Sequence, residues 1–99
     1  MDDARFAAAF VADKFRFDHW GRIKIRYMLH LKGVADNVVE EALQQIDETA
    51  YTETLEAFLK GKLRTTRAAT PFALRQKVVR AAIGRGFEPD LVFQVMNLS

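Results

Sequence analysis

Apolar residues recur at intervals of three and four along most of this chain, which is the spacing of amphipathic α-helices. The alanine-rich residues 2–15 carry Phe6 and Phe10 at this spacing, and residues 20–31 carry Ile25 and Leu29. Gly33 follows as a C-terminal stop for the second segment. Strand-like alternation is nearly absent, so the pattern predicts an all-α fold.

Four more helices are expected downstream. Asp36 and Asn37 are candidates to cap a third helix, whose buried stripe ends near residue 46. A fourth helix follows with almost no linker, from about residue 47 to about residue 63. Thr70 and Pro71 open a fifth helix with a hydroxyl cap and a proline in the first turn, and Pro89 starts a sixth. The inward faces predicted for the fourth and fifth helices are Tyr51, Leu55, Phe58, Leu59 and Leu63, and then Phe72, Leu74, Val78, Val79 and Ala82.

This helical pattern occurs twice. A shift of 53 residues places the turn Lys32-Gly33-Val34 on Arg85-Gly86-Phe87, and apolar positions on both sides of the turn then fall on apolar positions. A repeat this short usually needs a neighbour to complete its core. We therefore expect two tandem three-helix repeats, residues 1–46 and residues 47–99, arranged as a short array of helix-turn-helix-like units.

Charged residues are segregated into three blocks, although the formal net charge is only +2. Residues 14–32 contain six basic residues and one acid, residues 33–59 contain no Lys or Arg, and residues 60–87 contain no acid. Segregation of this kind produces local fields that steer association with charged partners. The two basic blocks are therefore the first places to look for a partner-binding surface.

Several segments of the chain form a familiar series. Residues 2–7 read Asp-Asp-Ala-Arg-Phe-Ala and are followed by Phe10-Val11. Residues 20–26 read Trp-Gly-Arg-Ile-Lys-Ile-Arg, with Leu29 and residues 32–34 (Lys-Gly-Val) after them. Lys77 and residues 85–87 (Arg-Gly-Phe) repeat part of this signature. In order and spacing, these segments resemble the end of the first repeat, the second repeat and the third repeat of the RecX family, over essentially the whole chain.

The resemblance implies a modulator that binds RecA, lies in the helical groove of the RecA–DNA filament, and suppresses ATP hydrolysis and strand exchange in recombination and SOS repair. RecX proteins usually carry three repeats, and this chain starts where the first is ending. It is therefore expected to be either a truncated piece or a naturally short protein. Either origin would leave Phe6 and Phe10 without part of their packing partner.

Basic residues are the candidates for contact with RecA or DNA. Arg22 and Arg26 lie four apart and share a helix face turned away from Ile25 and Leu29, with Lys24 on a flanking face. Such residues are often only a solvated surface, but the acid-free residues 60–87 make contact with phosphate or with an acidic protein surface an equal alternative. The complete candidate set is Arg22, Lys24, Arg26, Lys32, Arg64, Arg67, Arg75, Lys77, Arg80 and Arg85.

Aromatic and histidine residues in the first basic block suggest further chemistry. Phe15, Phe17 and Trp20 lie among cations, as in platforms that stack nucleic-acid bases. The simpler expectation is that Trp20 and Phe17 plug the junction between the first two helices. His19 and His30 lack a carboxylate at ligand spacing, so we expect structural, partly exposed side chains and no metal site.

Other classes of protein are disfavoured. The chain has no cysteine, which excludes disulfides, thiolate metal sites and thiol nucleophiles. No apolar run approaches the roughly 20 residues of a membrane span, and the N-terminus lacks the order of a signal peptide. No catalytic constellation and no phosphate-binding glycine loop is present. We therefore expect a cytoplasmic protein that is not an enzyme and uses no cofactor, membrane or small-molecule substrate.

Direct DNA binding is the alternative. In that hypothesis the second helix of each unit reads single- or double-stranded DNA in the helix-turn-helix manner, with Arg22 and Arg26 at the groove. Binding to naked DNA would then weaken steeply with salt, because phosphate contacts release counterions. The acid-rich residues 33–59 would repel DNA, which favours a partner of mixed charge.

Overall fold

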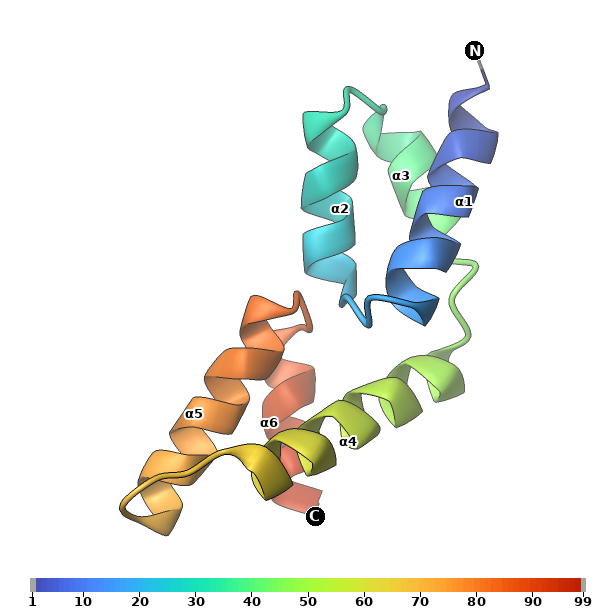
Figure 1. Ribbon diagram of the computed structural model, residues 1–99. Coiled ribbons are helices and arrows are strands. Elements are labelled where there is room, and N and C mark those ends of the chain that lie inside the picture. Colours follow the sequence, from blue (N-terminus) through green and yellow to red (C-terminus); the bar gives the residue numbers. More distant parts are fainter. Residues whose placement is uncertain (1, 99) are drawn as a thin grey trace.

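The computed structural model describes residues 2–98, and these form an all-α fold with no strand (Figure 1). Met1 and Ser99, the outer ends of the two predicted units, lie outside the described residues. The helices are α1 (Asp3–Arg16), α2 (Arg22–Leu31), α3 (Asp36–Leu43), α4 (Glu48–Thr65), α5 (Pro71–Gly84) and α6 (Pro89–Leu98).

The helices pack as two groups of three. α1, α2 and α3 contact one another, as do α4, α5 and α6. The molecule is elongated, with extents of 51 × 25 × 21 Å. The loop between α1 and α2 lies close to the turn between α5 and α6 (Figure 1). These groups agree with the expected array of three-helix repeats, and a unit boundary between residues 46 and 47 stays a prediction.

The cap predicted at Thr70 is confirmed, and Asp47 caps α4 although no cap was predicted there. Asp47 accepts a hydrogen bond from the Ala50 N–H at 2.9 Å, and Thr70 accepts one from the Ala73 N–H at 3.0 Å. The prediction for the third helix was wrong, because its N-cap is Ala35 and no side chain caps it. Asp36 is instead the first helical residue, where its negative charge interacts favourably with the positive end of the helix dipole.

The second helix begins two residues later than expected. Gly21 is extended, and its N–H donates to the Arg85 carbonyl instead of to a carbonyl in its own segment. The turn that ends α2 contains Gly33 at φ 82°, and its counterpart after α5 contains Gly86 at φ 97°. This left-handed conformation suits glycine, so both turns use the residue that the repeat predicted.

The core runs through both groups of helices. It includes Ile25 and Leu29 of α2, Tyr51 and Leu55 of α4, and Phe87 in the turn before α6, all fully buried. Two predictions for inward faces were wrong, since Phe72 is 71% exposed and Leu63 is 36% exposed. Phe72 is the second residue of α5 and therefore lies in its first turn.

Candidate partner-binding surface

Two glycines bring the two groups of helices into backbone contact. The Gly21 N–H donates to the Arg85 carbonyl at 2.8 Å, and the Ile23 N–H donates to the Gly86 carbonyl at 3.0 Å. A Cβ atom at Gly21 would lie 2.3 Å from the Gly86 carbonyl, and one at Gly86 would lie 2.4 Å from the Lys24 Cβ. Only glycine at both positions allows this approach.

A polar cluster lies beside this backbone contact between the two groups of helices. The Arg22 side chain donates from Nε to Glu88 Oε2 and from Nη1 to Glu48 Oε1, each at 2.7 Å. The Tyr51 hydroxyl accepts from the Arg22 N–H at 2.9 Å and donates to Glu88 Oε1 at 2.5 Å. The Arg22 guanidinium also lies over the Tyr51 ring, with Cζ 3.9 Å from the centroid. We call this cluster the joint, defined as Gly21, Arg22, Glu48, Tyr51, Gly86 and Glu88.

The joint shifts the pKa of its titratable groups. Burial acts to lower the pKa of Arg22, but the hydrogen bonds to Glu48 and Glu88 outweigh burial and raise it. Burial, and then the hydrogen bond to Glu88, raise the pKa of Tyr51 well above its ordinary value. Arg22 is therefore a charged structural residue, and Tyr51 is a neutral hydrogen-bond donor.

Other candidate cations also have partners within the molecule. Arg26 donates to Glu40 from Nε at 2.7 Å, and this hydrogen bond lowers the pKa of Glu40. Lys24 Nζ lies 4.4 Å from the Trp20 ring centroid, and Lys32 Nζ lies 5.6 Å from that of Phe10. Arg22 and Arg26 do share a face, as predicted, but on that face both guanidiniums are paired with carboxylates of other segments.

In the second unit, some candidate cations form hydrogen bonds within the molecule and others are exposed. Arg75 donates to the Asn97 side chain, Lys77 donates to the Arg67 carbonyl at 2.9 Å, and Arg85 donates to the Asp18 carbonyl at 2.7 Å. The Arg64, Arg67 and Arg80 side chains are exposed, and none of them forms an ion pair with a described residue. A contact role for all ten candidate cations stays a prediction.

The aromatic residues between α1 and α2 differ in their packing. Trp20 is partly buried, with Lys14 Nζ 4.9 Å from its ring centroid, so it packs at the junction as expected. The same expectation was wrong for Phe17, which is 69% exposed. Phe15 stacks on the Tyr51 ring with centroids 5.8 Å apart, which links α1 to α4. Trp20 and Phe15 therefore stabilise the fold.

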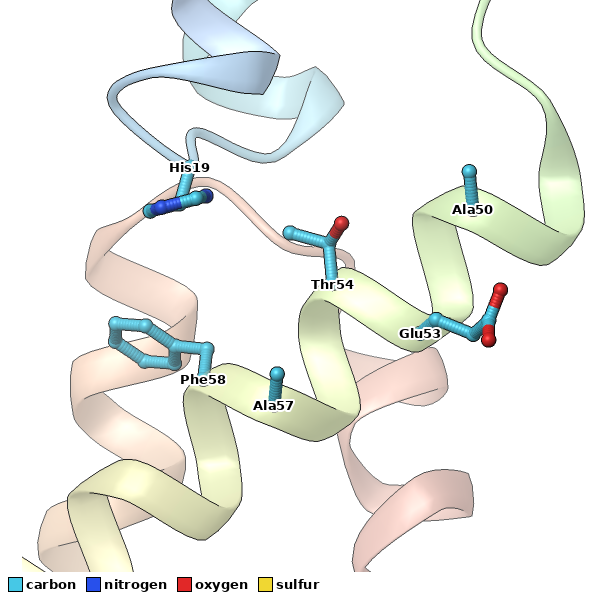
Figure 2. Close-up of a pocket in the computed structure, with 6 residues that line it drawn as sticks. All are labelled: His19, Ala50, Glu53, Thr54, Ala57 and Phe58. Carbon is cyan, nitrogen blue, oxygen red and sulfur yellow. The ribbon is translucent and has the colours of Figure 1, made fainter.

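A shallow depression lies beside the joint, between the α1–α2 loop and α4 (Figure 2). His19 extends over Phe58 and Thr54 from the loop, at a positive φ of 55°. Glu53 points away from His19, so the two side chains do not form an acid–base pair. Within residues 2–98, no group of three His, Asp or Glu residues could hold a metal ion.

Sequence reasoning missed two sets of residues. Glu48 and Glu88 of the joint gave no signal, and Tyr51 was predicted only as part of an inward face, because Arg22 meets all three only in the folded chain. An exposed apolar stripe on α2 was also missed, although its four-residue spacing was visible. The stripe consists of Ile23, Tyr27 and Leu31.

The fold and the joint define a class of protein: an all-α array of three-helix domains held in register by a glycine contact and a polar cluster. Within residues 2–98, no helix is both long and apolar enough to cross a membrane. Residues 2–43 match the second three-helix domain of RecX, and residues 49–96 match the third. The chain belongs to the RecX family.

Known relatives agree with this assignment. Regulatory protein RecX of Clostridium botulinum (strain Eklund 17B / Type B) is 32% identical over 99 residues, covering 98% of this chain and 46% of the relative. The Chlorobaculum tepidum protein of the same name is 33% identical over 97 residues, covering 98% and 58%. A crystal structure of regulatory protein RecX has a TM-score of 0.87 at 24% identity, covering 98% of this chain and 48% of that chain.

This chain spans about half the length of the relatives it matches. Those relatives are regulatory proteins, and RecX is not a known family of enzymes. The family assignment therefore supports a regulatory role.

Proposed function

We propose that this chain binds the RecA–DNA filament in the cytoplasm and inhibits ATP hydrolysis and strand exchange by RecA. The observation that carries the proposal is the presence of two RecX domains in the family's order, residues 2–43 and then residues 49–96. The chain acts by binding and needs no catalytic group of its own. Its units, residues 1–46 and 47–99, each contribute part of the contact.

The geometry favours a repetitive partner. Two similar units on a molecule 51 Å long can contact successive protomers of a filament. Linked contacts that are weak individually gain affinity through effective concentration, provided that the geometry allows both to form. The joint limits independent movement of the units, so it preserves this geometry.

Exposed cations supply charge complementarity for this partner. Arg64, Arg67 and Arg80 are exposed on the acid-free part of the second unit, whereas Arg22 and Arg26 are neutralised by carboxylates. We assign the larger share of the electrostatic contact to the three exposed arginines. The remaining candidate cations contribute at the edges of the surface.

Direct DNA binding remains a second candidate because residues 60–87 contain no acid. In the helix-turn-helix hypothesis, Arg22 and Arg26 would lie in a groove of the DNA. Since both guanidiniums donate to glutamates, reading bases with them would require breaking these ion pairs. Any DNA contact is therefore expected from the second unit, through phosphates and without sequence preference.

Filament and DNA binding can be separated in one experiment. Fluorescently labelled chain is titrated with preassembled RecA–single-strand filament and with the same naked DNA, at two salt concentrations. We expect binding to the filament and much weaker, salt-sensitive binding to naked DNA. Tight binding to naked DNA without preference for the filament would favour the second candidate, and binding to neither would contradict both.

A further inference from the structure

The outer face of α2 carries a continuous apolar stripe. Ile23, Tyr27 and Leu31 are 43%, 60% and 64% exposed. Residues four apart on a helix are neighbours on its surface, so these three side chains form one row along α2. The core face of the same helix is made by Ile25 and Leu29, which are fully buried. The stripe is therefore additional to the apolar residues that hold α2 in place.

Comparison with the second unit shows that folding does not require the stripe. The shift of 53 residues relates Ile23, Tyr27 and Leu31 to positions on α5 that are all exposed and lack a large apolar side chain. Those counterparts are Gln76, Arg80 and Gly84. The α5 helix nevertheless forms and packs through Val78, Val79 and Ala82. A polar face at these positions is thus compatible with the three-helix unit.

Stacking of one unit on another also leaves the stripe uncovered. The joint uses the start of α2 and the turn after α5, not the outer face of either helix. A Cβ atom at Gly84, the counterpart of Leu31, would meet nothing within 4 Å. The position therefore faces open space in a unit that has a neighbour docked beside it. A repeat placed against the first unit in the same way would leave Leu31 exposed.

The charges beside the stripe indicate what could cover it. Helix α2 contains no acidic residue, and Lys24 borders the stripe while Lys32 follows its end. On the opposite border, Arg26 is paired with Glu40, and His30 Nδ1 lies 3.2 Å from Asp36. The unbalanced charge next to the apolar row is positive. A protein segment with apolar side chains flanked by carboxylates complements both features.

Nucleic acid complements this surface less well. The centre of the face is apolar, and the arginines that could read bases on α2 are held by glutamates. Phosphate binding would place charge against Ile23, Tyr27 and Leu31 without a hydrogen-bond donor from the stripe other than the Tyr27 hydroxyl. The chemistry therefore favours a protein partner for this face.

We propose that Ile23, Tyr27 and Leu31, bordered by Lys24, form a docking surface for an apolar protein segment flanked by carboxylates. This proposal rests on the proposed function, and it places the segment on the RecA filament. Apolar and aromatic residues are typical of the centre of a protein interface, and polar or charged residues such as Lys24 are typical of its rim. The α2 stripe would thus supply the apolar contact with the filament. The exposed arginines of the second unit would supply the electrostatic contact.

The docking surface can be tested with substitutions that α5 already tolerates at the corresponding positions. The double variant Ile23→Gln, Tyr27→Arg installs on α2 the residues that α5 carries at the same positions. It removes apolar contact and adds a positive charge, so electrostatic attraction to an acidic partner cannot explain a loss of affinity. We expect at least a roughly tenfold weaker affinity for the preassembled RecA–single-strand filament. Affinity for naked single-stranded DNA should be unchanged or higher.

Two further variants complete the experiment. Phe93→Arg makes the same kind of change on α6, where Phe93 is 49% exposed, and should leave filament affinity unchanged. Leu31→Gln alters the most exposed side chain of the stripe, and it should weaken filament binding several-fold even if the double variant misfolds. Circular dichroism and the unfolding temperature report whether each variant is folded.

The outcomes separate the two proposals. If the unchanged chain does not bind the filament, the proposed function fails and this docking surface fails with it. If the unchanged chain binds and folded Ile23→Gln, Tyr27→Arg binds equally well, only the docking surface is overturned. An equal loss with Phe93→Arg, or a parallel loss of affinity for naked DNA, would also overturn it.

Discussion

At the scale of single residues, the Tyr51 hydroxyl forms hydrogen bonds with both groups of helices. The side chain is fully buried, and its hydroxyl accepts from the Arg22 N–H and donates to Glu88. The ring stacks on Phe15 of α1 with centroids 5.8 Å apart, and it contacts the tilted ring of Phe87 in the α5–α6 turn with centroids 5.4 Å apart. One side chain from α4 therefore connects segments of both units.

Replacing Tyr51 by Phe should destabilise the chain while keeping the ring packing. Because the Arg22 N–H and Glu88 lose a buried partner, we expect the free energy of unfolding to fall by about 1–3 kcal/mol at neutral pH. Urea denaturation followed by circular dichroism measures the loss. Tyr27→Phe, the same change at a 60% exposed side chain, is the control and should cost much less.

The stability lost in Tyr51→Phe should depend on pH. The pKa of Tyr51 in the folded chain is raised above the ordinary value of 10.0, mainly by burial. Its contribution to stability is therefore complete below about pH 10 and is lost as the pH rises, because the unfolded chain releases its proton first. The stability difference between the unchanged chain and Tyr51→Phe should narrow between pH 9 and pH 11. A constant difference over this range would contradict the assignment.

At the scale of elements, the two glycine turns are matched in conformation but differ in surroundings. Gly33 and Gly86 both have positive φ, at 82° and 97°. A Cβ atom at Gly33 would meet nothing within 4 Å, whereas one at Gly86 would meet the Lys24 Cβ at 2.4 Å. The first turn therefore needs glycine for its backbone conformation alone, and the second needs it for close approach as well.

Alanine substitutions at these positions should separate the two effects. Gly33→Ala should cost about 1–2 kcal/mol of unfolding free energy, because an L side chain is strained in the left-handed region. Gly86→Ala carries the same strain and must also displace α2, so its cost should be clearly larger. Urea denaturation of both variants tests the difference, and equal costs would argue against a close contact between the turn and α2.

Elements were the part of the structure that the sequence predicted best, because their signals are local. The cap at Thr70, the proline at the start of α5 and the glycines in both turns act within a few residues of themselves. Periodicity failed where exposure depends on distant helices. Phe72 has helical spacing like Val78 and Val79, which are buried, but it lies in the first turn of α5 and is 71% exposed.

At the scale of the whole molecule, the joint sets how the two units lie relative to each other. Its partners are far apart in sequence: Arg22 and Tyr51 are separated by 29 residues, and Arg22 and Glu88 by 66. No local pattern could indicate these pairs. The basic candidates were therefore identified as a set, but the sequence could not distinguish cations that hold the fold from cations that face solvent.

A cysteine-free chain allows the rigidity of the joint to be measured directly. Glu41→Cys on α3 and Gln94→Cys on α6 introduce two exposed sites for spin labels, one in each unit. We expect a narrow distance distribution by electron paramagnetic resonance. Adding Gly21→Ala, whose Cβ would clash with Gly86, should broaden or shift the distribution. A broad distribution without Gly21→Ala would contradict a rigid joint.

Inhibition of RecA is tested by the rate of ATP hydrolysis by RecA on single-stranded DNA as a function of added chain. We expect the rate to fall at chain concentrations below that of RecA, since each bound molecule contacts more than one protomer. An unchanged rate in molar excess of folded chain would show that the chain does not inhibit RecA.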